Sequence, residues 1–320
     1  DDAHFKLLER AGASQINGTT GYDRTNYFQT VPRHQLELAL WLESDRMGFL
    51  KGAISLANLD NQRKVVMNER RQSVDNRPYG PSYEAFVQTL FKKDHPYYGA
   101  IIGSMEDLQA ASLNDVHEFY DNYYAPANAT LVVAGDIDIP QTKKLIQRYF
   151  QSLPLRLRPS TPIVKTSPIE TEKRRVVQEP VVLAQVKLGW HSPPLFSDED
   201  ATADMLAYVV GAGKSSRLYR RLVIDKQLAL SVSARQESHS LVSVFAISAI
   251  AQPGVTTELL EQEIWVTLQE LRDKPAAKSE VIKARNMLIT QNISSLQDIG
   301  QVADRLNAYN HYAGTPDYLS

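Results

Sequence analysis

The sequence has 320 residues, a formal net charge of −2, 43% hydrophobic residues and no cysteine. This length fits two domains of ordinary size. A nearly neutral chain argues against nucleic acid as the main partner, because proteins that bind it carry a basic face. No apolar run approaches the length of a membrane span. The lack of cysteine excludes disulfides, thiolate catalysis and cysteine-based zinc sites. It is also more typical of a bacterial periplasmic or exported protein.

The first half of the chain predicts a helix-rich domain with a strand hairpin. Its start reads as the end of a helix over 1–10, and the threonines, tyrosines and partial alternation of 16–31 predict two paired strands. The apolar run Ala-Thr-Leu-Val-Val-Ala at 129–134 predicts a buried strand that ends at Gly135. Apolar periodicity and capping residues predict helices over 36–49, 58–76, 83–91, 112–123 and 140–150.

The second half predicts a domain of the same kind. Prolines become frequent over 151–179, which predicts a linker between domains. We therefore expect a first domain over 1–155, a linker over 156–179 and a second domain over 180–320. Strands are predicted over 181–190, 231–234 and 241–251, and helices over 198–210, 217–228, 256–272 and 278–291. The similar order predicts an internal duplication and an α/β fold of the α+β type: two homologous domains, each a mostly antiparallel sheet with helices on one face.

Glu69 is the most informative side chain of the first half. On a helical wheel it falls between Val65 and Val66 in angle, and Gln62 and Ser73 share that side. The wheel therefore predicts an inward-facing carboxylate, which is costly to bury without a cation. Three arginines lie nearby in sequence, so an ion pair with arginine and a bound metal ion both stay open.

Other candidate motifs fail on one required position each. His34 and Glu37 match part of the inverted zinc motif H-x-x-E-H, but Leu38 replaces its last histidine, so His34 is interpreted as a surface residue. No complete H-x-x-E-H or H-E-x-x-H motif occurs in the sequence. The run Gly-Ala-Gly-Lys-Ser-Ser at 211–216 lacks the first glycine of a phosphate loop and is interpreted as a helix stop.

Several segments taken together resemble one family, the pitrilysin/insulinase zinc peptidases, which carry the inverted H-x-x-E-H motif. The resemblance is to the bacterial branch that is similar to the mitochondrial processing peptidase, and it covers essentially the whole chain. The segments that carry it follow the family's order and are 14–27, 42–47, 62–80, 119–136 and 215–222. Each is moderately specific, and the order makes the set distinctive.

The resemblance implies that Glu69 is the third zinc ligand. It also implies an H-x-x-E-H helix upstream of Asp1, with two histidine ligands and the glutamate that activates water. This sequence does not contain that motif. We therefore expect a fragment that binds no zinc and has no peptidase activity by itself, because a catalytic zinc site needs three protein ligands. In an intact enzyme, metal-assisted hydrolysis of peptides or small unfolded proteins is implied.

The resemblance also assigns the substrate-binding residues and a missing partner. The strand containing Asn17, Gly18, Thr19 and Thr20 is expected to pair with the main chain of a peptide. Gln62 replaces an auxiliary glutamate that many members carry, so we expect no catalytic residue in this chain. The family's substrate-clamping arginine and tyrosine would fall at Val223 and Leu230. The zinc-bearing half is thus expected to need a second clamshell half, in cis or as a partner subunit.

Two other hypotheses about the function stay open. The chain could be a non-catalytic scaffold or partner subunit of the same fold, which holds a peptide or protein without cleaving it. It could also be an unrelated peptide-binding or assembly module that uses only an exposed strand edge.

Overall fold

The computed structural model describes residues 3–160 and 163–318, and these residues form two compact units. Unit 1 comprises Asp1–Asn68, Ile101–Ile163 and Ser295–Ser320, and unit 2 comprises Glu69–Ala100 and Val164–Ser294. The units are therefore not consecutive halves of the sequence. The predicted boundaries of two domains, 1–155 and 180–320 with a linker over 156–179, stay a prediction. Positions 1–2 of the expected first helix and 161–162 of the expected linker lie outside the described residues.

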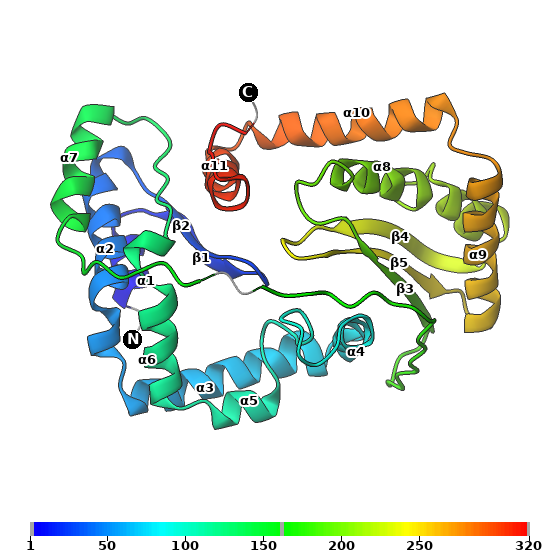
Figure 1. Ribbon diagram of the computed structural model, residues 1–320, viewed down its shortest axis with the longest axis horizontal. Coiled ribbons are helices and arrows are strands. Elements are labelled where there is room, and N and C mark those ends of the chain that lie inside the picture. The colour runs from blue at the N-terminus through cyan, green and yellow to red at the C-terminus, as the bar shows by residue number, and fades with distance from the viewer. Residues whose placement is uncertain (1–2, 161–162, 319–320) are drawn as a thin grey trace. The chain divides into compact units, whose positions relative to one another are not determined.

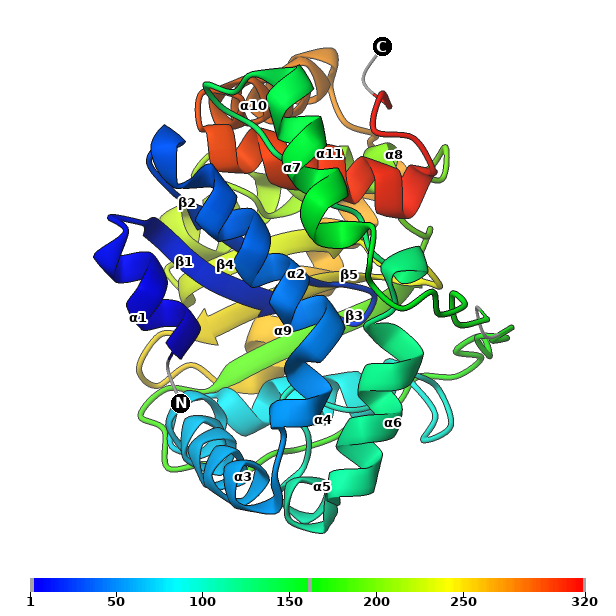
Figure 2. The same cartoon turned by 90° about the vertical axis from the view of Figure 1, so that its left-hand side faces the viewer.

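Unit 1 is a helical unit around one strand hairpin. Strand β1 (Ser14–Thr20) pairs antiparallel with β2 (Thr25–Thr30). Its helices are α1 (Ala3–Arg10), α2 (Leu36–Ala53), α3 (Leu56–Arg70, up to Asn68), α5 (Met105–Ala110), α6 (Leu113–Tyr123), α7 (Ile139–Phe150) and α11 (Ile299–Ala313), with short 3-10 turns at Arg33–Gln35 and Pro126–Asn128. α1 lies beside β1, and α7 packs against α2 (Figure 2).

Four helices of unit 1, α5, α6, α7 and α11, begin where a side chain accepts from a free main-chain amide. Ser112 accepts from the Asp115 amide while Asp115 accepts from the Ser112 amide, which completes a capping box before α6. Asp138 caps α7 and Asp298 caps α11 in the same way. The predicted helix start at Ser112 is confirmed.

Unit 2 contains a three-stranded antiparallel sheet with the order β3-β5-β4. The strands are β3 (Gln185–Ser192), β4 (Ala229–Glu237) and β5 (Ser243–Ala251). The helices are α4 (Gly80–Leu90), α8 (Asp200–Val210), α9 (Thr257–Asp273) and α10 (Lys278–Ser295), with π-helical turns at Arg71–Asp75 and Tyr219–Asp225. The predicted hairpin of the second half is confirmed as β4 and β5.

The core of unit 2 lies on one face of this sheet. Leu188, Ile247 and Ala234 form one cross-strand row, and alternate residues beside them are also buried. The helices α8 and α9 cover this face (Figure 1). On the opposite face α4 packs against β3, where Gly189 leaves room for the Phe86 ring.

Most of the predicted helices and strands are present in the structure. The predicted mixture of helices and antiparallel sheets is confirmed. The predicted strand at 129–134 is wrong: this segment is extended without a strand partner in the part of the chain that the structure describes. The main-chain oxygen of Thr130 accepts instead from the Asn307 side chain at 3.0 Å, and Asn310 binds the Thr130 hydroxyl at 2.8 Å. None of the described helices is long and apolar enough to cross a membrane.

Candidate functional site

The predicted substrate strand lies on an open edge of the hairpin. Gly18 pairs with Tyr27, Thr19 with Asn26 and Thr20 with Thr25. The sheet of unit 1 has only these two strands among the described residues, so the outer edge of β1 has no strand partner there. The side chains from Asn17 to Thr20 are exposed to solvent. Such an edge is a template for an added strand.

Tyr27 on β2 packs against the strand β1 that carries this edge. Its ring lies over the strand partner Gly18, and Arg46 stacks on the ring with Cζ 4.1 Å from the centroid. The Tyr27 and Tyr124 hydroxyls share a hydrogen bond. Burial, and then this hydrogen bond, raise the pKa of Tyr124 well above its usual value, so the phenol stays protonated. Three separate predicted segments, 14–27, 42–47 and 119–136, thus supply one packed cluster.

The helix α11 anchors the other strand of the hairpin. Asp304 Oδ1 accepts from Arg24 at 2.6 Å and from the Asn26 side chain at 2.9 Å. Asn26 in turn accepts from the Thr19 amide at 3.2 Å, which carries the connection to β1. A ring nitrogen of His311 also lies 3.1 Å from the Asp23 oxygen at the hairpin turn. The turn and β2 are therefore held, while the outer edge of β1 pairs with no other strand among the described residues.

The first residues of this edge are already bent and partly occupied. The pairing register shifts between Ser14 and Asn17, and Gln15 has a φ of 52°, in the left-handed region. The Gly18 amide donates to the side chain of Asn17 at 2.8 Å. A peptide carbonyl that pairs with this amide would have to displace the Asn17 side chain.

Glu69 does not face inward as the wheel predicts. Its side chain and that of Gln62 are exposed, and Val65 is 48% exposed. The buried residue at this point of α3 is Arg70, which pairs with Glu84 at 2.8 Å. The wheel fails because three consecutive apolar residues, 65–67, spread over more than half of the helix circumference and define no single inner face. The proposed role of Glu69 as a metal ligand is not tested by this exposure.

The remaining predicted positions lie in different settings. Val223 packs against the core of unit 2, and Leu230 on β4 is 55% exposed. Neither side chain can donate a hydrogen bond. His34 is exposed, as its interpretation as a surface histidine requires.

Zinc needs three protein ligands at a catalytic site. No group of three or more histidine, cysteine, aspartate or glutamate side chains in the described residues could hold a metal ion. The single exposed carboxylate of Glu69 does not fit a zinc site by itself. We therefore derive no catalytic step through a metal from these residues.

Two cationic side chains of unit 2, Lys187 and Arg235, were not predicted as site residues. They lie on the sheet face opposite the core, beside two pockets that share Tyr83 and Arg235. The signal was present in the strand pattern, because both cations alternate with apolar core residues.

Comparison with known proteins places these features in one family. Residues 110–288 match the family described as the peptidase M16 inactive domain. The zinc protease PqqE of Helicobacter pylori is 31% identical over 319 residues, which are 98% of this chain and 71% of that protein. A crystal structure of a protease from Helicobacter pylori has a TM-score of 0.89 at 30% identity, covering 97% of this chain and 75% of that chain. A peptidase M16 inactive domain from Pseudomonas fluorescens has a TM-score of 0.83 at 15% identity, covering 99% and 74%, which supports the fold alone.

Proposed function

Because the chain belongs to the M16 peptidase family, we propose that it serves as the non-catalytic, peptide-holding part of a zinc protease. An extended peptide would add as a third strand along β1, beside Asn17, Gly18, Thr19 and Thr20. The observation that carries this proposal is the exposed edge of β1, which has no strand partner among the described residues.

Strand addition suits a protease that accepts many sequences. The peptide is held through main-chain hydrogen bonds, which every residue except proline can make. The side chains of the bound peptide project from the two faces of the sheet and therefore contribute little to its selection. The rigid backing of Tyr27 and Arg46 supports the proposal, because a preorganised edge loses little entropy when the peptide binds.

Glu69 is proposed as the one zinc ligand in this sequence. Its exposed side chain is accessible to a metal ion, and residues 3–160 and 163–318 contain no group of three or more ligands that could complete the site. In the natural full-length protein, Glu69→Gln is expected to lower the zinc content measured by atomic absorption. The neighbouring exposed Asn68→Asp should leave the zinc content unchanged. Equal zinc content in Glu69→Gln and the unchanged protein would remove Glu69 from this role.

A second clamshell half, in cis or as a partner subunit, is part of the proposal. The apolar Val223 and Leu230 support it, because the resemblance places a substrate clamp at these positions in the complementary half. The same two residues and Gln62, which replaces the auxiliary glutamate, support the alternative function, a scaffold subunit that binds a peptide or protein without cleaving it. The two differ in zinc content and in cleavage by the full-length protein.

The peptide-holding role is tested with N-methylated peptides. In an added strand, every second residue of the peptide points its main-chain amide at the protein. N-methylation of those residues therefore removes all of the amides that pair with β1, while N-methylation of the other residues removes none of them. A labelled unstructured decapeptide, and two versions methylated at odd or at even positions, are titrated with this chain by fluorescence anisotropy. One methylated version should bind more weakly by about tenfold or more, while the other binds like the parent.

Three outcomes decide the test. Equal weakening of both methylated peptides would contradict pairing along one edge, and so would no weakening of either. The peptide recovered from the mixture should be intact by mass spectrometry, since the chain is proposed to be non-catalytic. Cleavage that a chelator abolishes would instead show a peptidase within this sequence.

A further inference from the structure

The sheet of unit 2 carries two cations on the face opposite its core. Lys187 on β3 pairs in register with Ser248 on β5, which pairs with Ser233 on β4. Two residues along the strands, Gly189 and Ala246 form the next row with Arg235. The other residues of these two rows are small, so only the side chains of Lys187 and Arg235 extend above the sheet here.

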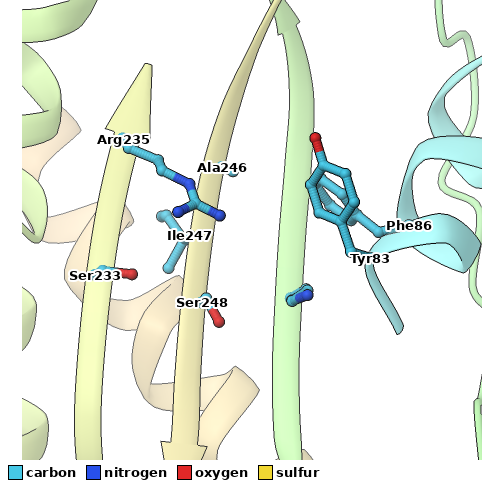
Figure 3. Close-up of a pocket in the computed structure, with 8 residues that line it drawn as sticks. Tyr83, Phe86, Ser233, Arg235, Ala246, Ile247 and Ser248 are labelled. Carbon is cyan, nitrogen blue, oxygen red and sulfur yellow. The ribbon is translucent and has the colours of Figure 1, made fainter. Parts of the chain in front are cut away.

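Arg235 uses the space that these small residues leave. Figure 3 shows its side chain crossing from its own strand over β5 toward Tyr83. Glu237 pairs with its Nε at 2.6 Å. The two terminal nitrogens take no acceptor among residues 3–160 and 163–318. One edge of the guanidinium is thus satisfied and the other is available.

Lys187 lacks an ion-pair partner in the described chain. Its Nζ donates to the neutral hydroxyl of Ser82 at 3.0 Å and lies 5.7 Å from the Tyr83 ring centroid. Burial, and then the charge of Arg235, lower the pKa of Lys187, while Glu237 and Glu179 oppose this. A half-buried cation beside a second cation is costly unless an anion joins them.

A larger pocket adjoins this cationic face. It is lined by Arg77, Tyr79, Tyr83, Glu84 and Arg235, with other residues of 73–80, and has a volume of about 400 Å³. The smaller pocket at Lys187 shares Tyr83 and Arg235 with it and has a volume of about 10 Å³, room for one water at most. We call the two together the arginine pocket.

The charge of the arginine pocket favours a single negative group. Its only lining carboxylate, Glu84, is held by Arg70 at 2.8 Å. Arg77 is exposed, and its guanidinium has no acceptor in the part of the chain that the structure describes. Arg77, Lys187 and Arg235 therefore face two nearby carboxylates, Glu237 on Arg235 and Glu179, whose Oε2 accepts from the Tyr79 amide at 3.1 Å. Nearby Glu179 and Glu237 make a dianion a poorer match than a carboxylate.

From this geometry we infer that the arginine pocket binds a carboxylate of a peptide, through Arg77 and Arg235 with Lys187 beneath them. Tyr79 and Tyr83 would cover the apolar part of the residue that carries the carboxylate. The carboxylate is either the C-terminus of the peptide or an acidic side chain. This inference rests on the proposed peptide-holding function, and it adds a chemical preference at a second place on the chain.

Four probes separate the sources of the anion, by isothermal titration calorimetry on the 320-residue chain. They are acetyl-Ala-Ala-Phe with a free carboxylate, its C-terminal amide, acetyl-Ala-Glu-Phe amide, and inorganic phosphate. At least one carboxylate peptide should bind, the uncharged amide should not, and added salt should weaken binding. The free-carboxylate and glutamate peptides tell the C-terminus from the side chain.

The deciding variant is Arg77→Gln, because Arg77 is exposed and its loss should not affect folding. We expect it to weaken the bound carboxylate peptide by about tenfold or more, and Lys187→Met to do the same. The matched controls are Arg220→Gln and Lys214→Met, exposed cations of the same unit outside the pocket. Lys187→Met should also melt no lower than the unchanged chain, since it removes a desolvated charge without an ion pair.

Several results would overturn the inference. They are binding unchanged by Arg77→Gln, equal binding of the amide and the carboxylate, binding of phosphate alone, and no binding of any probe. Gly18→Val separates this inference from the proposed function, because the short probes do not need the hairpin. If the N-methylated peptides show no strand addition in the unchanged chain while the short probes still bind through Arg77, only the proposed function is contradicted.

Discussion

Gly18 and Tyr27 face each other across the β1–β2 hairpin, and the tyrosine ring fills the space that a side chain at Gly18 would need. A Cβ built on Gly18 would lie 3.0 Å from Tyr27 Cδ1 and 3.1 Å from the Asn26 oxygen. Contacts this short force a neighbour to move. The glycine is therefore required for the close approach of ring and strand, not for an unusual backbone angle.

Gly18→Val should destabilise unit 1 and weaken strand addition. The added methyl groups must displace the Tyr27 ring from its position between Gly18 and Arg46, which we expect to cost about 1–3 kcal/mol of unfolding free energy. Urea unfolding followed by circular dichroism measures this change. The N-methylated peptides described above measure the loss of binding.

The matched control for this variant is Gly52→Ala. Gly52 lies in α2, and a Cβ there would meet no atom within 4 Å. Alanine should stabilise the helix by up to about 1 kcal/mol. If Gly18→Val were as stable as the unchanged chain, the ring and the glycine would not be coupled.

Asp304→Asn should loosen the hairpin without unfolding the unit. One carboxylate oxygen accepts from both Arg24 and Asn26, and an amide oxygen in its place is a weaker acceptor for the arginine. We expect a loss of about 1–2 kcal/mol, seen as faster hydrogen exchange of the amides of 25–30. Asp136→Asn is the control, because its pair with Arg33 is exposed on both sides. Equal exchange in both variants would contradict the anchoring role of α11.

The hairpin and most helices could be predicted because their signals are local. Alternation marks β1 and β2, and Ser112 with Asp115 marks the start of α6. The helix α11 was missed although Asp298 caps its start and Gly314 ends it in the left-handed region. The local signal for α11 is therefore present in the sequence, although no helix is predicted beyond residue 291.

The misplaced features depend on contacts distant in sequence. The segment 129–134 has the apolar sequence of a buried strand. However, the side chain of Asn307 donates a hydrogen bond to the main-chain oxygen of Thr130. Glu69 was predicted to face inward from Val65 and Val66, whereas the buried side chain is Arg70, which pairs with Glu84 on α4. A helical wheel shows one helix only, so it cannot include Glu84, which lies on α4. The division into units also mixes distant segments, which composition alone does not reveal.

His95 should make the unfolding free energy of unit 2 sensitive to mild acid. Its Nδ1 accepts from the Tyr97 amide at 3.0 Å, and its ring stacks on Phe91 at 4.6 Å. Burial, and then His191, lower the pKa of His95, while Asp94 opposes them. The folded state thus favours the neutral ring. Its stability is fully present above the unfolded pKa of about 6.5 and decreases as the pH falls below it.

His95→Asn should reduce this acid sensitivity. Asparagine keeps an acceptor near the position of Nδ1 but does not titrate. Urea unfolding between pH 7.5 and pH 5 should show a smaller decrease for the variant than for the unchanged chain. Some decrease should remain, because burial also lowers the pKa of His191. His34→Asn, at an exposed position, should leave the slope unchanged. An unaltered slope in His95→Asn would show that His95 does not titrate on unfolding.

Glu280 should contribute stability that is lost only in strong acid. Hydrogen bonds from Arg217 at 2.9 and 2.8 Å, aided by the Ala277 amide, lower the pKa of Glu280 from 4.5 to about 2, against an opposing effect of burial. The carboxylate is ionised in the folded chain where the unfolded chain is already protonated. The contribution is therefore present above about pH 4.5 and disappears as the pH falls toward 2.

Glu280→Gln and Arg217→Met, alone and together, test whether this pair is the source. Each single variant should be less stable than the unchanged chain at pH 7, and the double variant should lose less than the sum of the two. At pH 2 the difference between Glu280→Gln and the unchanged chain should be much smaller than at pH 7, because Glu280 is then protonated in the unfolded chain and about half protonated in the folded chain. Glu170→Gln, at an exposed position outside any helix or strand, is the control at both pH values. Additive losses at pH 7 would mean that the arginine and the carboxylate act separately, and the hydrogen-bonded pair would then explain none of the acid sensitivity.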